Sequence, residues 1–271
     1  MRKKKRGQPT MASQSDRYAL YLRSVQVPEH EVHMFDRFYK AVNGRPPVSL
    51  REDFCGTGAV SVEWAQKKGR YAIGVDLDPE PLSWGLLFNA ARLSPEEKKR
   101  LLLVRGDVRT LRSPPVDVLA AQNFSFFIFK QRQELLRYFQ AAYSHLKKNG
   151  IFVLDMMGGS ELMTEGDEEE RRVGRGITYV WEHERFDPIT HDARFHIHFR
   201  FDDGSALERA FTYDWRLWTL PEVRELLEEA GFSRSDVYWE GERRGRPSGI
   251  YRRQTSAEPD PAWVAYVVGV K

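Results

Sequence analysis

Up to residue 156, segments with the hydrophobic pattern of a strand alternate with segments with the hydrophobic spacing of a helix. Short apolar runs, typical of buried strands, are each followed by a segment whose apolar residues recur at helical spacing. We expect strands over 47–54, 71–75, 101–105, 116–121 and 151–156, and helices over 28–42, 60–68, 80–92 and 132–147, the last capped by Gly150. Because strand and helix alternate, this part of the chain predicts an α/β fold with a mostly parallel sheet and helices on both faces.

The pattern changes after residue 157. Residues 158–176 are polar and suggest a mobile connection, after which three strand-like segments at 177–186, 193–201 and 207–217 predict a three-stranded antiparallel insertion. A helix over 221–230 and strands over 236–240 and 263–270, joined by a polar loop, then return to the first domain. The resulting main sheet has seven strands, and the last two form a C-terminal antiparallel pair.

The composition describes a globular protein whose basic charge is local. With 271 residues, 41% of them hydrophobic, the chain can bury a substantial core, which excludes disorder as its general state. The net charge is +3, but residues 2–6 carry five positive charges, and without them 37 of the 42 Lys and Arg face 39 Asp and Glu. Any binding of a polyanion must therefore rest on this N-terminal arm.

Cysteine content and hydropathy bear on the compartment. The single cysteine, Cys55, excludes an internal disulfide and a set of zinc thiolates, so we expect a reducing, cytoplasmic setting. The basic run at 3–6 also fits a nuclear import signal if the source is a eukaryote. The most apolar stretch, 116–129, contains Asp117 and Gln122 and is too short and polar to span a bilayer, so no membrane partner is expected.

A glycine turn, Gly56-Thr57-Gly58, lies between the first strand and its helix. Bare backbone can approach a ligand there, and a helix N-terminus favours an anionic group. Asp76 ends the second strand, Asp107 ends the third and Asn123 lies just beyond the fourth. Ligands of open α/β sheets bind outside the carboxyl ends of the strands, so these residues predict one shared cofactor site.

Each of these features also has an ordinary structural interpretation. Asp76 and Asp107 can each cap a helix or turn, and one Gly-x-Gly is weak evidence. The dinucleotide fingerprint places a third glycine where this chain has Ser61, which disfavours a nicotinamide cofactor. The turn together with polar residues at successive strand ends favours a different nucleoside cofactor.

On these residues the chain resembles the class I S-adenosylmethionine-dependent methyltransferases. The glycine turn, Asp76 and Asp107 are similar to that family's glycine loop, ribose-binding acid and adenine-binding acid, and Asn149-Gly150 before an apolar strand is also similar. The resemblance implies a Rossmann-like fold and S-adenosyl-L-methionine as cofactor. The residues expected to bind it are Tyr21, Arg23, Glu52, Cys55, Gly56, Thr57, Gly58, Asp76, Leu77, Asp107, Val108 and Asn123.

One part of the family motif differs. The family has an acid, an apolar residue and a glycine before the Gly-x-Gly, where this chain has Glu52, Asp53 and Phe54. Either Glu52 or Asp53 can therefore take the acidic role, and Phe54 implies an altered backbone path or a cofactor approached mainly by Cys55 and Gly56. Cys55 itself has no paired base in the sequence, so we interpret it as a small packing residue.

Methyl transfer requires alignment more than chemistry from side chains, with a base needed only for a protonated or weak acceptor. Our candidates for catalysis are Asp155, which interrupts an apolar strand, His196 and Tyr213. His196 and His198 share a strand face that can meet solvent, line the acceptor site or bind a metal; no third ligand is evident, so no metal is expected. Tyr213 can equally pack in a core.

Two segments near the N-terminus bear on the site. Tyr21 and Arg23 precede the first long helix, in a segment that folds over the cofactor in similar methyltransferases; the alternative is an exposed amphipathic turn. The sequence His30-Glu31-Val32-His33 does not have the spacing of a zinc-binding HExxH helix. We interpret its charged residues as a solvated face.

We therefore expect four parts: a disordered basic arm (1–15), an N-terminal helical cap (16–45), a cofactor-binding core (46–158 and 220–271) and an inserted antiparallel β lid (159–219). The inserted sheet resembles that of small-molecule methyltransferases that act on amines or sugar amines. The leading hypothesis is methyl transfer to nitrogen or oxygen of a small-molecule acceptor. The alternatives are a nucleic-acid or protein methyltransferase recruited through the arm, and a non-catalytic interaction module.

Overall fold

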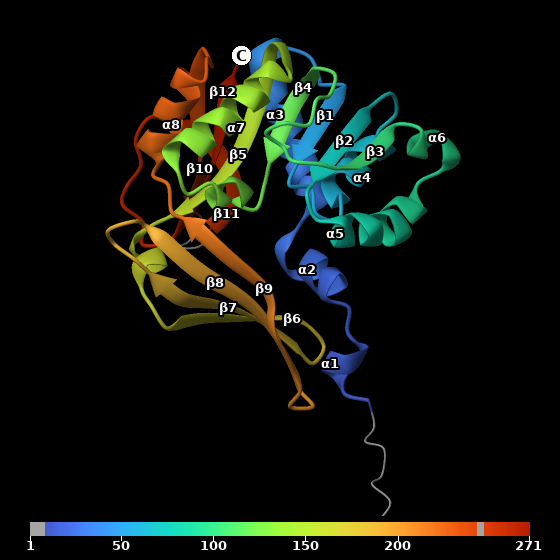
Figure 1. Ribbon diagram of the computed structural model, residues 1–271, viewed down its shortest axis with the longest axis vertical. Helices are drawn as coiled ribbons and strands as arrows, with labels where there is room; N and C mark the ends of the chain where they lie inside the picture. Colours follow the sequence, from blue (N-terminus) through green and yellow to red (C-terminus); the bar gives the residue numbers. More distant parts are fainter. Residues whose placement is uncertain (1–8, 243–246) are drawn as a thin grey trace, which may run out of the picture. The chain divides into compact units, whose positions relative to one another are not determined.

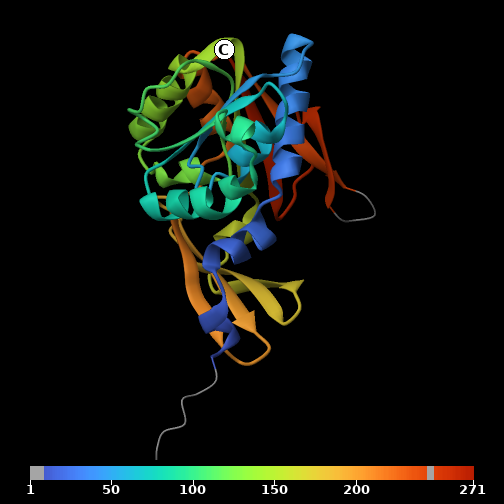
Figure 2. The same ribbon diagram turned by 90° about the vertical axis from the view of Figure 1, so that its right-hand side faces the viewer.

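The structure, a computed structural model, describes residues 9–242 and 247–271 (Figures 1 and 2). The chain divides into two compact units. The minor unit contains the N-terminal segment up to Gln26 together with Met163–Asp214. The major unit contains Val27–Leu162 and Trp215–Lys271.

The major unit is built on an eight-stranded sheet of order β11-β10-β12-β5-β4-β1-β2-β3. Neighbours from β5 to β3 are parallel, whereas β12, β10 and β11 are added antiparallel at one edge. The strands are β1 (Ser49–Asp53), β2 (Tyr71–Asp76), β3 (Leu101–Arg105), β4 (Val116–Ala121), β5 (Leu146–Gly158), β10 (Arg234–Glu242), β11 (Pro247–Gln254) and β12 (Trp263–Val270). Every residue of β1 and β4 is buried, as expected for central strands covered on both faces.

Helices cover both faces of this sheet (Figure 1). Alternate residues of β5 show this: Ile151 and Val153 pack in one core with α3 and α4, while Phe152 packs against Phe139 of α7 and Phe232 after α8. The helical segments are α3 (Pro28–Asn43), α4 (Ala59–Gln66), α5 (Pro79–Trp84), η1 (Gly85–Asn89), η2 (Ala90–Arg92), α6 (Pro95–Lys98), η3 (Ser125–Ile128), α7 (Arg132–Ser144), η4 (Ser160–Met163) and α8 (Leu220–Glu229).

The minor unit is a four-stranded antiparallel sheet with two short helices on one face. Its elements are α1 (Met11–Gln14), α2 (Arg17–Val25), β6 (Asp167–Gly174), β7 (Ile177–Phe186), β8 (Asp192–Phe201) and β9 (Ala206–Arg216). Ile197, Phe199 and Phe201 of β8 form a core with Ala12 of α1 and Leu20 of α2. These three residues alternate along β8 with His196 and His198, so the apolar face lies opposite the shared histidine face expected from the sequence.

The predicted α/β class, parallel sheet and antiparallel C-terminal edge are confirmed, but each sheet has one strand more than expected. β11 lies in the expected polar loop and makes eight strands in place of seven; β6 lies in the expected mobile connection and makes the insertion four-stranded. Both are edge strands, which keep one row of backbone groups open and need no apolar residues. Residues Asp167–Arg172 of β6 are all exposed.

Two further expectations differ from the structure. Gly150 does not cap α7, because the helix ends at Ser144 with His145 as its cap and Gly150 lies within β5. Residues 1–8 of the expected disordered arm lie outside the described residues, and α1 lies within the remainder of that arm. The expected helical cap is shared between units, since α2 belongs to the minor unit and α3 to the major unit.

Among the helices in the described part of the chain, none combines the length and the apolar character needed to cross a membrane.

Candidate active site

The glycine turn follows β1 and leads into α4. Phe54, Gly56 and Gly58 all have left-handed φ angles, of 56°, 53° and 64°. Phe54 thus adopts a conformation that favours glycine, and its ring packs against Tyr138 with the centroids 5.5 Å apart. Gly58 is the N-cap of α4 and has no side chain to cap the helix, and the Glu52 carboxylate accepts the Ser61 N–H in its first turn.

Two residues that follow β2 contact the glycine turn and hold Thr57 in place. The side-chain amide of Asn89 donates to the Thr57 carbonyl oxygen at 3.0 Å and to its hydroxyl oxygen at 3.1 Å. A Cβ added at Gly85 would lie 2.1 Å from the same carbonyl oxygen, so only glycine allows this approach. Neither residue is identifiable from the sequence as part of the site, since nothing in their local pattern links them to a turn about thirty residues earlier.

Asp76 and Asp107 both lie at the carboxyl edge of the sheet, as predicted. Asp76 accepts the N–H groups of Gly56 at 2.7 Å and Asp78 at 2.9 Å, and burial raises its pKa. Asp107 accepts from the guanidinium of Arg109, whose hydrogen bonds lower the pKa of that carboxyl. Asp76 therefore fastens the glycine turn, while Asp107 has a local cationic partner.

The neighbouring candidates differ in exposure. The Leu77 side chain is 65% exposed beside Asp76. Val108 is buried, and its carbonyl oxygen accepts from Arg51. Cys55 is also buried, and burial raises the pKa of its thiol well above the usual value. A neutral thiol suits the packing role expected for Cys55.

The structure distinguishes the two acids before the turn. Glu52 is buried, and its Oε2 accepts the N–H of Ser61 at 2.8 Å and its hydroxyl at 2.5 Å, in the first turn of α4. Asp53 forms a buried ion pair with Arg51 at 2.7 Å and accepts from the Tyr138 hydroxyl at 3.1 Å. Because Asp53 is neutralised by Arg51, the geometry favours Glu52 for the acidic role.

Asp155 near the end of β5 holds the turn that follows β4. Its carboxylate accepts the N–H groups of Asn123 at 2.8 Å and Phe124 at 2.9 Å, both of which have left-handed φ angles. Burial raises the pKa of Asp155 to about 6. Next to this turn, Oε1 of the buried Gln122 has no hydrogen-bond partner among the described residues.

Glu31 in the first turn of α3 completes a group of carboxylates that the sequence analysis did not identify. The Tyr266 hydroxyl lies 3.0 and 3.1 Å from its two oxygens, and Tyr266 is opposite Asp155 in the β12–β5 ladder. Burial, then repulsion from Asp155 and from Glu52, raise the pKa of Glu31 to about 8. The expectation of a solvated charged face is therefore wrong for Glu31, although His33 is exposed.

The remaining candidates belong to the minor unit. The hydroxyl groups of Tyr21 and Tyr213 are hydrogen-bonded to each other, and Tyr21 packs on Phe211 with centroids 4.8 Å apart. Arg23 is exposed, and its guanidinium lies where a Cβ on Gly174 would be 2.6 Å away. The roles assigned to Tyr21, Arg23 and Tyr213 stay predictions.

The histidine face of β8 is occupied by side chains from the adjacent strands. His196 is buried, with Nδ1 2.8 Å from the Thr212 hydroxyl and Nε2 3.1 Å from a Glu184 oxygen. His198 lies between the carboxylates of Glu182 and Glu208. Within the described ranges, no three His, Cys, Asp or Glu side chains are grouped to hold a metal ion. The role of His196 in catalysis stays a prediction.

Comparisons with known proteins agree with this geometry. Residues 53–154 match a family profile described as "Methyltransferase domain". No curated protein sequence matches the chain. The range 53–154 contains the glycine turn and the carboxyl ends of β2, β3 and β4.

Similar solved structures cover nearly the whole chain. An S-adenosylmethionine-dependent methyltransferase from Clostridium acetobutylicum is 18% identical, with 92% of this chain and 96% of that chain covered and a TM-score of 0.67. CalS10, an amino pentose methyltransferase from Micromonospora echinaspora solved with S-adenosylmethionine, is 18% identical, with coverages of 93% and 95% and a TM-score of 0.66. KedS8, a sugar N-methyltransferase from a Streptoalloteichus species, is 17% identical, with coverages of 100% and 98% and a TM-score of 0.64. At these identities the likeness shows the fold, which is the Rossmann-like fold predicted from the sequence.

Proposed function

We propose, from the match of residues 53–154 to a methyltransferase domain and from the Rossmann-like fold, that the chain is a class I S-adenosylmethionine-dependent methyltransferase that transfers a methyl group to a nitrogen or oxygen atom of a small-molecule acceptor. The observation that carries this proposal is the group of three carboxylates, Glu31, Glu52 and Asp155, in the major unit. Amines are the acceptors that this group favours.

Burial makes ionisation of these three carboxylates unfavourable. Burial raises the pKa of Glu52 to about 7 and that of Asp155 to about 6. The pKa of Glu31 is raised by burial and also by repulsion from Asp155 and Glu52. In the described part of the chain, none of the three has a Lys or Arg among its hydrogen-bond partners. Backbone N–H groups donate to Asp155 and Glu52, and the Ser61 and Tyr266 hydroxyl groups are bonded to Glu52 and Glu31. A bound cation would stabilise the ionised form of each carboxylate.

S-adenosylmethionine fits these residues. It presents a sulfonium and an ammonium group, and when bound it supplies an activated methyl group. We assign the ribose hydroxyls to Asp76, the adenine to the region of Asp107 and Val108, and the methionine part to the glycine turn and Glu52. Each of these residues lies at the carboxyl edge of the sheet, where ligands of open α/β sheets bind.

The chain's own residues would then orient the acceptor and manage its proton. Methyl transfer is a displacement that requires the nucleophile about 3 Å from the methyl carbon, so positioning supplies most of the rate. A protonated amine must lose its proton before it can attack. Glu31, with a pKa of about 8, suits the role of proton acceptor at its Oε atoms. Both oxygens of Asp155 already accept backbone N–H groups, which suits it to orient the acceptor.

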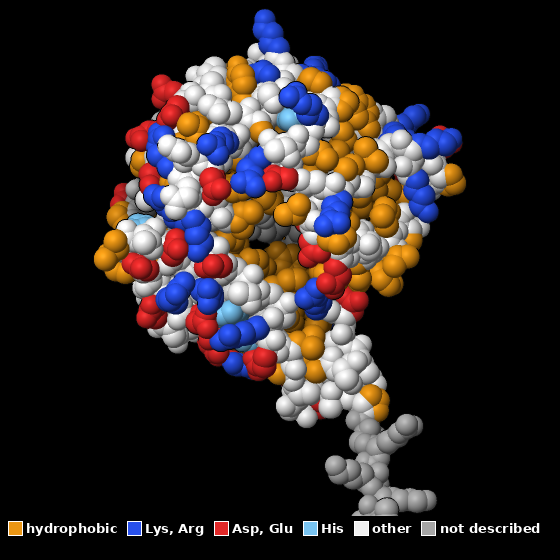
Figure 3. Space-filling model, viewed as in Figure 1, with side chains coloured by type: hydrophobic (Ala, Val, Ile, Leu, Met, Phe, Trp, Pro, Cys, Tyr) orange, Lys and Arg blue, Asp and Glu red, His pale blue; other side chains and the backbone are white. Residues whose placement is uncertain are grey.

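Small amines are supported over nucleic acids. Two of the similar structures are described as acting on an amino pentose and on a sugar nitrogen. On the face shown in Figure 3, Lys and Arg side chains are interspersed with Asp and Glu and form no single basic patch. The basic arm that motivated the nucleic-acid alternative lies mostly in residues 1–8, outside the described residues.

A thermal-shift panel with S-adenosylmethionine, S-adenosylhomocysteine, NAD and NADP tests the cofactor. A ligand at a hundredfold excess over its Kd stabilises the native state by about 2.7 kcal/mol. We expect a shift with the first two compounds only. A shift with NAD or NADP alone would overturn the proposal.

A methyl-transfer assay tests the acceptor. Amino sugars, neutral sugars and RNA are offered to the full chain and to a variant lacking Met1–Gly7. We expect transfer to an amine in both proteins. Transfer to RNA that disappears with the arm, together with inactive amines, would instead support the nucleic-acid alternative.

A further inference from the structure

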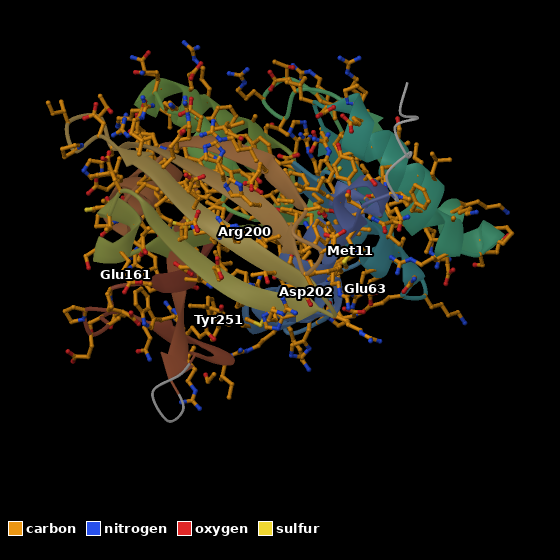
Figure 4. All side chains as sticks on the ribbon, turned by 90° about the horizontal axis from the view of Figure 1, so that it is seen from below. Met11, Glu63, Glu161, Arg200, Asp202 and Tyr251 are labelled. Atoms are coloured by element: carbon orange, nitrogen blue, oxygen red, sulfur yellow. The ribbon has the colours of Figure 1, made fainter. Side chains whose placement is uncertain are left out.

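A pocket of about 660 Å³ lies in the major unit, away from the glycine turn. Its wall contains two tryptophans and two acids. The lining residues are Ser160, Trp239, Ala257, Glu258, Pro259, Asp260, Pro261 and Trp263. Figure 4 labels Glu161 of η4, the residue after Ser160, and Tyr251 of β11. We call this cavity the tryptophan pocket.

Two consecutive glycines allow the pocket to form. Trp263 begins β12 opposite Gly158 of β5, and a Cβ on Gly158 would lie 2.0 Å from its indole ring. Gly159 has a φ of 113°, and a Cβ there would lie 2.2 Å from the Pro261 carbonyl oxygen. The Glu161 N–H donates to the same oxygen at 3.0 Å. The indole and the proline segment therefore rest directly on the end of β5.

The two indoles form one aromatic surface. The ring centroids of Trp239 and Trp263 are 4.9 Å apart, with the planes inclined by 39°. Both residues are only partly buried, although tryptophan side chains carry large apolar area. Pro259, Pro261 and Ala257 add further apolar lining. This surface suits the apolar face of a saturated ring.

The charge of the lining has one sign. Glu258 and Asp260 are its charged residues, and no Lys or Arg is among the lining side chains. Asp260 Oδ1 accepts the N–H of Ala262 at 3.0 Å, which holds the carboxylate in place at the rim. Carboxylates beside an aromatic surface attract a cation through both ionic and cation–π interactions.

We infer that the tryptophan pocket binds a protonated amine carried by a saturated ring, as in an amino sugar, with the ring against the indoles and the ammonium group at Asp260 and Glu258. The inference goes beyond the proposed function, because it assigns an amine-binding site outside the cofactor site and the carboxylate group. Side chains alternate between the two faces of a strand, so Gly158, Trp263 and Trp239 lie on the face of the sheet opposite Asp155 and Tyr266. The tryptophan pocket is therefore separate from those carboxylates.

The inference is tested by titrating the full chain with D-glucosamine, D-glucose and N-acetylglucosamine. Binding is measured by tryptophan fluorescence and saturation-transfer NMR. We expect saturable binding of glucosamine that is about 5-fold tighter than that of the two neutral sugars. This preference is the size expected for a partly exposed contact between the ammonium group and a carboxylate. Asp260→Asn should remove this 5-fold preference, because it keeps the turn acceptor but not the charge. Gly158→Ala should abolish binding by displacing the Trp263 ring.

Matched controls keep the test specific. Glu96→Gln removes an exposed carboxylate on α6, and Trp84→Phe removes a tryptophan of α5; neither should change glucosamine binding. Equal binding of glucosamine and glucose, or unchanged binding by Asp260→Asn, would overturn the inference. If S-adenosylmethionine stabilises the protein but glucosamine does not bind, only the pocket assignment fails. If glucosamine binds but S-adenosylmethionine gives no shift, the proposed function fails and the binding site stands.

Discussion

The carboxylate of Asp76 accepts the main-chain N–H of Gly56 at 2.7 Å, joining the end of β2 to the glycine turn. The residue expected to bind the cofactor ribose thus also holds the turn that approaches the cofactor. Its other oxygen accepts the Asp78 N–H at the start of α5. Substitution of Asp76 will therefore change both binding and the local backbone.

Asp76→Ala should abolish the thermal shift given by S-adenosylmethionine. It should also lower the free energy of unfolding without ligand by about 1–3 kcal/mol, because the N–H of Gly56 loses its acceptor. Asp76→Asn, which keeps an acceptor oxygen, should recover much of the stability but not the shift. An unchanged shift in the alanine variant would contradict the ribose assignment.

Gly85→Ala should disturb the cofactor site without touching the cofactor. The new Cβ would lie 2.1 Å from the Thr57 carbonyl oxygen, so the glycine turn or η1 must move. We expect S-adenosylmethionine affinity, measured by calorimetry, to fall about tenfold, which corresponds to about 1.4 kcal/mol. Gly241→Ala is the matched control, since its Cβ meets neighbours only at 3.5 Å and beyond, and should bind normally.

Cofactor affinity should increase with pH between about 6 and 8. Glu31, Glu52 and Asp155 have raised pKa values of about 8, 7 and 6, and a bound cation favours their ionised forms. Binding therefore releases protons, which calorimetry in buffers of different ionisation enthalpy will measure. Affinity independent of pH, with no proton release, would show that these carboxylates do not face the cation.

Stability without ligand should have the opposite dependence on pH. The folded pKa of Glu31 lies above its usual value of 4.5, so the folded state binds the proton more tightly. This contribution is fully present below pH 4.5 and is lost as the pH rises through about 8. In urea unfolding, Glu31→Gln should gain stability relative to the native protein between pH 5 and pH 8. A constant difference between the two proteins would mean that Glu31 titrates normally.

Asp53→Asn should strongly destabilise the protein. Arg51 is fully buried, and its ion pair with Asp53 is the charge partner that the substitution removes. Breaking a buried pair costs about 3–5 kcal/mol, whereas Glu96→Gln in the exposed pair with Lys99 should change stability by less than about 1 kcal/mol. The comparison is made by urea unfolding, and a small effect of Asp53→Asn would mean that other groups neutralise Arg51.

Local periodicity determined most of the fold from sequence alone. The expected strand at 116–121 and the structure's β4 coincide, and the expected helix at 28–42 differs from α3 by one residue. The glycine turn and Asp76 were likewise placed correctly at the carboxyl edge, because strand ends and turn residues have signals within a few positions of the chain. These signals are short-range: spacing decides which face of a helix or strand is apolar.

Tertiary structure alone decided how distant residues share a site. Glu31 and Tyr266 are separated by 235 positions and meet because α3 packs against the sheet that contains β12. The edge strands β6 and β11 were missed because an open edge requires no apolar pattern. The face that His196 shares with His198 was left open to solvent, the acceptor site or a metal, and in the structure His196 is buried beside a carboxylate of β7 and a hydroxyl of β9. Sequence spacing indicates which side chains share a face; long-range packing determines what that face meets.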